Sequence, residues 1–257
     1  MRITWIGAGN LANGLGRALK SAGYEFGQVY SRTLESASLL AAALDAEAVV
    51  DPKAIRPDAD CYICALKDDA LADVLPLIHF GEGVLLHTAG SLSIDVLLPY
   101  SQKVGVLYPL QTFSKAKTVD FTALPIFIES NDKSVENLLF DLARSLSNNV
   151  QLADSKKRLS MHVSAVFACN FVNYMYTIAS DILQDNDLDI QLLIPLILET
   201  AEKLKSISPV EAQTGPAVRF DQKVMVKHLE VLSGHPDWQK LYEVLSTGIY
   251  QRQHSKI

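Results

Sequence analysis

The sequence predicts an α/β fold: a doubly wound parallel sheet of the Rossmann type, followed by an all-helical second domain. Three observations predict it. Short apolar runs alternate with amphipathic helical segments over residues 1–153, and a glycine-rich turn joins the first run to the first helix. From residue 154 to the C-terminus, helical periodicity continues with almost no strand signal. We therefore expect two domains, 1–153 and 154–257.

The expected elements follow in order. The strands of the first domain are predicted at residues 2–7, 26–30, 46–50, 60–66, 84–87, 104–107 and 125–129, in a parallel sheet covered on both faces. Its first helix carries Leu11, Leu15 and Leu19 on one face and ends at Gly23, and further helices are predicted at 34–44, 69–78 and 135–146. The second domain opens with one long helix over 154–183, capped by Asp154 or Ser155, and continues with helices at 190–206, 221–232 and 238–251.

Composition excludes several classes of protein. Hydrophobic residues make up 49% of the 257 residues and charged residues 20%, which is typical of a soluble globular protein. The net charge is −6, and no basic stripe is present that would neutralise nucleic-acid phosphates. The most apolar stretch, 163–179, contains two asparagines and is shorter than the roughly 20 residues of a membrane span. We expect no nucleic-acid partner and no membrane segment.

Cysteine usage indicates a reducing, cytoplasmic location. The chain has three cysteines, too few for a disulfide framework. Cys61 and Cys64 form a C-x-x-C pattern, but they lie in a predicted strand, where residues three apart point to opposite faces. We therefore expect no metal site there.

The glycine-rich turn is a G-x-G-x-x-A motif in the context that binds dinucleotides. It follows a strand and opens a helix. Gly7 permits the tight turn, Gly9 lets a pyrophosphate approach the backbone, and Ala12 lets the helix pack closely on the strand. The alternative is a strand-to-helix turn without a ligand. The residues assigned to the pyrophosphate are Gly7, Ala8, Gly9, Asn10 and Leu11.

The end of the second strand indicates NADP rather than NAD. An NAD enzyme places a carboxylate there to accept a hydrogen bond from the ribose 2′-hydroxyl. This chain has Ser31, Arg32 and Thr33, so a guanidinium and two hydroxyls are available to a 2′-phosphate. We expect NADP(H) to bind at least about tenfold more tightly than NAD(H), which requires only ~1.4 kcal/mol. The alternative is a surface arginine beside a threonine that caps the next helix.

These residues resemble a known group of domains. The N-terminal half is similar to the NADP-binding domain of pyrroline-5-carboxylate reductases, ketopantoate reductases and deazaflavin-dependent NADP reductases. The whole chain resembles a family of oxidoreductases that pair this domain with a helical domain of poorly defined function, similar to the C-terminal domain of 6-phosphogluconate dehydrogenase. The motifs that carry this resemblance are residues 87–91, residues 108–113, His162 followed by Asn170, and residues 214–221 followed by His228. Phe220 departs from the family, which tends to have glycine there.

The resemblance implies further cofactor contacts. Ala65, Leu66 and Lys67 after the fourth strand would line the cofactor ribose, and Thr88, Ala89, Gly90 and Ser91 would border the nicotinamide. Both segments are carboxyl ends of strands, where open α/β sheets bind ligands. Lys67 and the two aspartates after it have an alternative interpretation as a loop and helix cap.

The candidate catalytic residues are His162, Asn170 and Ser91. On a regular helix Asn170 would lie ~80° from His162 around the axis and Asn173 ~20° from it. The functional interpretation makes His162 a proton donor and Asn170 a substrate contact. The alternatives are polar groups that satisfy one another in a core, and a Ser91 that only shapes a turn. Hydroxyacid dehydrogenases have a lysine on this helix, but Lys156 and Lys157 are predicted to be exposed.

The sequence therefore favours an NADP-dependent oxidoreductase that exchanges a hydride with a small carbonyl or imine substrate. The alternative is a non-catalytic NADP-binding protein whose helical domain recognises a partner. Arg219 and Asp221 are expected to pair with each other rather than clamp a substrate carboxylate, with His228 nearby. The apolar face of the long helix exceeds what one small domain covers, so we expect a homodimer.

Overall fold

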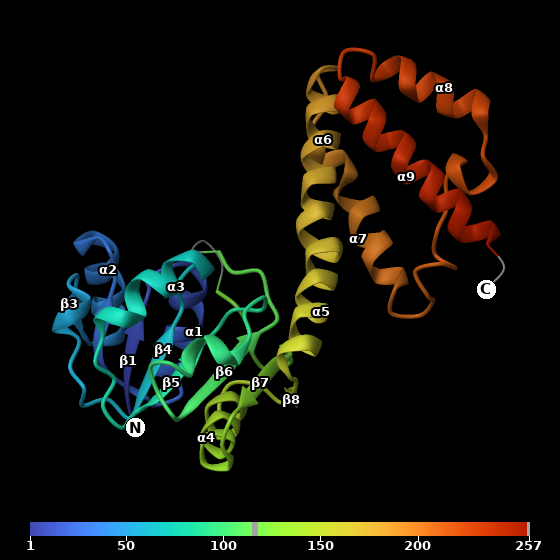
Figure 1. The fold of residues 1–257 in the computed structure, drawn as a ribbon. Helices are drawn as coiled ribbons and strands as arrows, with labels where there is room; N and C mark the ends of the chain where they lie inside the picture. Colours follow the sequence, from blue (N-terminus) through green and yellow to red (C-terminus); the bar gives the residue numbers. More distant parts are fainter. Residues whose placement is uncertain (115–117, 256–257) are drawn as a thin grey trace. The chain divides into compact units, whose positions relative to one another are not determined.

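The structure is a computed structural model that describes residues 1–114 and 118–255 (Figure 1). The chain divides into two compact units, residues 1–170 and 171–257. The sequence placed the boundary at 153/154. The helix after that point stays with the first unit because Ser155 and Arg158 both bond to Glu129 of the sheet. The strands are β1 (Arg2–Ile6), β2 (Glu25–Tyr30), β3 (Glu47–Val49), β4 (Cys61–Cys64), β5 (Val84–His87), β6 (Val104–Pro109), β7 (Ile126–Ser130) and β8 (Val150–Leu152).

The strands form an 8-stranded sheet in the order β3-β2-β1-β4-β5-β6-β7-β8. The doubly wound order follows from the first unit's alternation of strand and helix, with the switch point between β1 and β4. The expectation of a parallel sheet is wrong for one pair, because β7 runs antiparallel to β6. A parallel partner needs a crossover long enough to return to the same edge, usually a helix, and the described part of the 110–125 connection contains none. The sequence also missed β8, which pairs in parallel with β7.

Helices cover the two faces of the sheet. In the first unit they are α1 (Asn10–Ser21), α2 (Leu34–Leu44), α3 (Asp68–Val74), α4 (Lys133–Arg144) and α5 (Ser155–Ala165). The buried side chains of α1, α2 and α4 share one apolar cluster with Trp5 and Cys61, whereas those of α3 share another with Ile6 and Cys64. Successive strand residues thus point to opposite faces. The two β4 cysteines accordingly lie on opposite faces, and burial raises the pKa of each thiol.

The predicted long helix is present but changes character in its middle. Asp154 caps α5, accepting a hydrogen bond from the Lys157 backbone N–H at 2.7 Å. A π-helical stretch, Val166–Phe171, follows α5, and α6 (Val172–Gln184) follows that. Because a π-helix turns less per residue, the angles expected for Asn170 and Asn173 on a regular helix do not apply.

The second unit is built from helices. They are α6, α7 (Ile194–Lys203), α8 (Gln222–Val231) and α9 (Pro236–His254). Among this unit's described residues, Ala217, Leu232 and Ser246 are the buried ones. Across the described part of the chain, no helix has the length and apolar character needed to cross a bilayer.

Candidate functional site

Four turns meet at the carboxyl edge of the sheet. The Gly7 N–H donates to the Tyr30 carbonyl at 2.8 Å, and the Ala65 N–H donates to the Ile6 carbonyl at 2.7 Å. The Thr88 N–H donates to the Cys64 carbonyl at 3.2 Å. The turns after β2, β1, β4 and β5 therefore lie side by side, at the edge where open α/β sheets bind ligands.

The glycine turn has room for a pyrophosphate. Gly7 has φ +111°, and a Cβ there would lie 2.4 Å from the Ala65 carbonyl oxygen, so only glycine fits. A Cβ at Gly9 would meet no atom within 4 Å, so this residue borders open space beside the N-terminus of α1. Gly9 caps α1 with no side-chain hydrogen bond, which leaves N–H groups of the first turn for an anion. The residues present fit the nucleotide that the motif predicts.

The turn after β2 presents its guanidinium to solvent. Arg32 is exposed, and it forms no ion pair with any residue in 1–114 or 118–255. Thr33 caps α2, with Oγ1 accepting from the Ser36 N–H at 3.4 Å, as the alternative interpretation expected. A hydroxyl that accepts from the backbone still has its own proton to donate. Both roles predicted for this turn are therefore compatible.

A cavity of about 890 Å³ opens beside these turns, and every residue lining it belongs to the first unit. This volume is within the range of small-molecule sites, about 300–1,000 Å³. Of the predicted site residues, the cavity brings together Asn10, Leu11, Ala65, Leu66, Thr88, Ala89, Gly90, Ser91, His162 and Asn170. Lys67 lies at the exposed N-cap of α3, and Asn173 lies beyond the first unit.

The cavity contains a residue pair that the sequence did not predict. Tyr108 Oη lies 3.1 Å from His162 Nδ1. A Cβ on Gly90 would lie 2.7 Å from His162 Nδ1 and 2.8 Å from Tyr108 Cζ, so the turn at residues 88–92, the Gly90 turn, packs directly on both rings. Burial raises the pKa of Tyr108, and the positive charge of Arg158 opposes that shift. One signal was available, because Tyr108 precedes the last residue of β6 at the ligand-binding edge.

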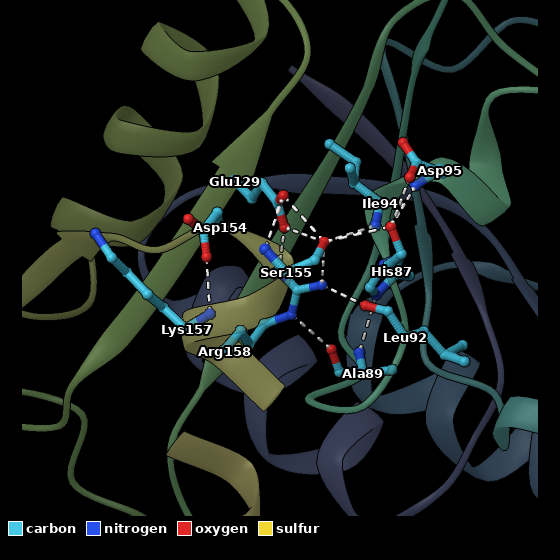
Figure 2. A network of polar contacts seen from close by, with 11 residues as sticks. His87, Ala89, Leu92, Ile94, Asp95, Glu129, Asp154, Ser155, Lys157 and Arg158 are labelled. Atoms are coloured by element: carbon cyan, nitrogen blue, oxygen red, sulfur yellow. Dashed lines mark hydrogen bonds and ion pairs between the residues drawn. The ribbon is translucent and has the colours of Figure 1, made fainter. Parts of the chain in front are cut away.

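Arg158 holds the Gly90 turn in place (Figure 2). Its side chain is 1% exposed. Nε donates to the Ala89 carbonyl at 3.2 Å, and one terminal nitrogen donates to the Leu92 carbonyl, so the guanidinium binds the turn on both sides of Gly90. The other terminal nitrogen pairs with Glu129 of β7, which also accepts from Ser155. Because His162 lies one helical turn after Arg158, the same clamp sets the His162 ring against Gly90.

A second histidine, His87, contacts the same turn and is neutral. His87 is fully buried, and burial together with the charge of Arg158 lowers its pKa to about 4. Its Nδ1 accepts from the Ala89 N–H at 3.1 Å. His87 therefore helps to hold the Gly90 turn as a neutral hydrogen-bond acceptor.

Ser91 is tied to α3. Its Oγ donates to Asp68 Oδ2 at 2.5 Å, so the hydroxyl that the sequence offered as a catalytic candidate anchors the turn. Lys156 and Lys157 are exposed, as predicted. Neither lysine lines the cavity.

The expected pairing of Arg219 with Asp221 is wrong. Asp221 caps α8, accepting from the Val224 N–H at 3.3 Å, and no ion pair joins it to Arg219 among the described residues. His228 does not join Asp221 either, because its Nδ1 lies 2.9 Å from Tyr242 Oη. The Asp221 carboxylate instead satisfies a free N–H group at the start of α8, a local role that competes with an ion pair.

The departure at Phe220 has a structural consequence. Phe220 has φ 52° and ψ 47°, the left-handed conformation that favours glycine. Its ring packs on Tyr250 with centroids 4.9 Å apart. The aromatic contact thus accompanies a strained backbone.

Comparisons with known proteins agree with this architecture. Residues 2–90 match the family described as NADP oxidoreductase, coenzyme F420-dependent, and residues 124–249 match a domain of unknown function, DUF2520. A putative NADP oxidoreductase from Bacteroides fragilis is 44% identical, with 98% of each chain covered and a TM-score of 0.94. A comparison with curated proteins gives no match.

Two more distant structures share the fold. One is a 1-pyrroline-5-carboxylate reductase from Streptococcus pyogenes, with a TM-score of 0.61, 16% identity and 98% of each chain covered. The other is an imine reductase from Myxococcus stipitatus in complex with NADP+, with a TM-score of 0.67, 12% identity, and 98% of this chain and 92% of that chain covered. The chain therefore belongs to a family of NADP oxidoreductases that joins a Rossmann-type domain of the F420-dependent class to a DUF2520 domain.

Proposed function

We propose that the protein transfers a hydride between NADPH and a small carbonyl or imine substrate. The observation that carries the proposal is the packing of the Tyr108–His162 pair on Gly90. It sets two proton-bearing side chains at the carboxyl edge of a cofactor-binding sheet, inside a cavity large enough for a substrate. The imine reductase and pyrroline-5-carboxylate reductase of the same fold make the C=N bond as reasonable a target as C=O.

Each cofactor contact is proposed for one part of NADPH. Arg32 with its neighbouring hydroxyls would bind the 2′-phosphate, and the free N–H groups at the start of α1 would bind the pyrophosphate. Thr88, Ala89 and Gly90 would border the nicotinamide. The complete proposed set is Gly7, Ala8, Gly9, Asn10, Leu11, Ser31, Arg32, Thr33, Ala65, Leu66, Lys67, Thr88, Ala89 and Gly90.

The cofactor supplies the hydride, so the chain must supply a proton, orientation and charge stabilisation. His162 is the proposed source of the proton, and Asn170, which lines the same cavity, is the proposed substrate contact. Ser91 is proposed to keep the wall of the cavity in place through its bond to Asp68.

Two measurements test this function. In titrations followed by the fluorescence of the protein, NADPH should bind at least about tenfold more tightly than NADH. Arg32→Gln should remove that preference, whereas Arg17→Gln should preserve it.

Turnover is then measured over a panel containing 1-pyrroline, 3,4-dihydroisoquinoline, benzaldehyde and phenylglyoxal. His162→Ala should bind NADPH normally and lose turnover. Tight NADPH binding without turnover of any panel member would favour the non-catalytic alternative.

We also infer that the protein acts as a homodimer in the cytoplasm. The second unit exposes many large apolar side chains, including Leu192, Leu196 and Val231, each more than half exposed. Large apolar side chains exposed in such number are typical of an interaction site, and a second copy of the same chain is the commonest partner. Cys61, Cys64 and Cys169 are all free thiols, which suits a reducing compartment. A monomer in sedimentation at micromolar concentration would refute the dimer.

A further inference from the structure

We propose that Tyr108 gives the proton to the substrate directly and that His162 replaces the proton that Tyr108 loses. This inference rests on the proposed function and names the order of proton transfer at the same site. It assigns Tyr108 a catalytic role that the sequence reserved for His162.

The first argument is the single hydrogen bond available to His162 Nδ1. A ring nitrogen makes one hydrogen bond in the plane of the ring, and at Nδ1 this bond is made with Tyr108 Oη. The edge of the ring that faces Gly90 is therefore occupied by the phenol. A hydroxyl, in contrast, has one proton to donate and two lone pairs, so Oη can bond to His162 and to a substrate together.

The second argument is position. Tyr108 Cζ, the carbon that bears the hydroxyl, would lie 2.8 Å from a Cβ on Gly90. The hydroxyl is thus attached to a carbon that packs on the Gly90 turn, where the proposed function puts the reacting end of the nucleotide. Tyr108 is 8% exposed and lines the cavity, and Val106, Phe127 and Ala153 pack around it. This packing keeps the phenol in one orientation.

The proton balance is simple. In the charged imidazole, Nδ1–H donates to Oη, so the phenol proton points elsewhere and is free for a substrate. When the substrate heteroatom takes that proton, the Oη–H bond breaks and Oη takes the Nδ1 proton in return. Tyr108 ends neutral, His162 ends neutral, and solvent protonates the imidazole again. NADPH, when bound, supplies the hydride that completes the reduction.

The surroundings of Tyr108 favour transfer of a proton from His162 through Tyr108 over a Tyr108 that stays deprotonated. Burial raises the pKa of Tyr108, with Arg158 as the opposing charge, so a lasting phenolate is disfavoured and the lost proton must be replaced at once. Among the described residues, the other titratable or charged groups that line the cavity are Asp68 of α3, which is bonded to Ser91, and Cys169 of the π-helical stretch. Arg158 of α5 and the buried His87 both bond to Ala89 of the Gly90 turn.

The test begins without cofactor. Ring ¹⁵N chemical shifts of His162, assigned with His162→Gln, should report a hydrogen bond at Nδ1. Tyr108→Phe, which removes only Oη, should change these shifts, whereas the matched control Tyr100→Phe should not. Identical His162 shifts in wild type and Tyr108→Phe would overturn the proposal.

Kinetics then decide which residue donates. With a panel member that the wild type reduces, Tyr108→Phe should lower kcat by about 100-fold or more, because general acids contribute about 10²–10⁴. Its KM and its NADPH dissociation constant should stay within about threefold of wild type. His162→Gln should also lower kcat, because Tyr108 then has no residue that replaces its lost proton. A Tyr108→Phe rate within about tenfold of wild type would mean that His162 donates directly. If no panel member is reduced, the proposed function fails while the ring shifts still report the hydrogen bond.

Discussion

The two units of the molecule differ sharply in how much they bury. The first contains three clusters of buried apolar residues, on both faces of the sheet and under α5. The second has three buried positions among its described residues, Ala217, Leu232 and Ser246, and its apolar side chains stay largely accessible. The first unit therefore has a core of its own, whereas the second leaves many apolar side chains of its helices exposed.

This difference also separates the kinds of chemistry available. A core and a buried ion pair can hold the Gly90 turn and the Tyr108–His162 pair in fixed positions. A unit with little buried surface is better suited to association, because its exposed apolar area is stabilised only when a partner covers it. The predictions below test each side of this comparison.

The largest effect is expected in the first unit, at Arg158. Arg158→Met leaves the Glu129 carboxylate without its partner, and breaking such a buried pair costs about 3–5 kcal/mol of unfolding free energy. Urea denaturation measures the loss. Arg158→Met combined with Glu129→Leu should recover part of it, and exposed Arg144→Met serves as the matched control. A double variant as unstable as the single one would argue against the pair.

The next effect concerns the second unit. Leu196 of α7 is 63% exposed, and Leu196→Asp would place a charge in the proposed dimer interface. Both copies of the chain carry the substitution, and burying a leucine in an interface contributes about 1.5–3 kcal/mol. The dissociation constant of the dimer should therefore rise by about 100-fold or more. Sedimentation velocity measures this. Leu39→Asp, also 63% exposed but in the first unit, should leave association unchanged.

The third effect is the pH dependence of stability in the first unit. The pKa of His87 is lowered to about 4 in the folded chain, whereas an unfolded histidine has a pKa of about 6.5. The unfolded state thus binds more protons between these values, and stability is lost as pH falls through that window. Going from pH 7 to pH 5 should remove about 2 kcal/mol. His87→Asn should flatten this dependence in urea titrations, and a slope that survives His87→Asn would assign it to other groups. Exposed His79→Asn should leave the slope unchanged.

The smallest effect is expected at Phe220. Its left-handed backbone costs any L-residue about 1–2 kcal/mol relative to glycine. Phe220→Ala loses the contact with Tyr250 and retains the strain, whereas Phe220→Gly loses the same contact and relieves it. Phe220→Gly should therefore be more stable than Phe220→Ala by about 1 kcal/mol in thermal unfolding. Equal stability would show that the backbone relaxes when the ring is removed.

Local patterns were enough for most of the fold. The second helix and the fifth strand were predicted at 34–44 and 84–87, the bounds that α2 and β5 have. The glycine turn followed from a local requirement, because a backbone at φ +111° excludes side chains. Pairing direction was not predictable in this way. The antiparallel β7 depends on the path of a connection, and β8 is only three residues long.

The sequence by itself determined the α/β class, the two regions of different periodicity and the family of NADP oxidoreductases, since each is carried by neighbouring residues. Only the tertiary structure brought Tyr108 to His162, which is 54 residues away, and Arg158 to Ala89, which is 69 residues away. Such contacts depend on how strands and helices pack, and neither partner carries a mark of the other in its own segment. Packing of distant segments therefore assembles the candidate site, whereas the turns proposed to bind the cofactor are recognised from short motifs.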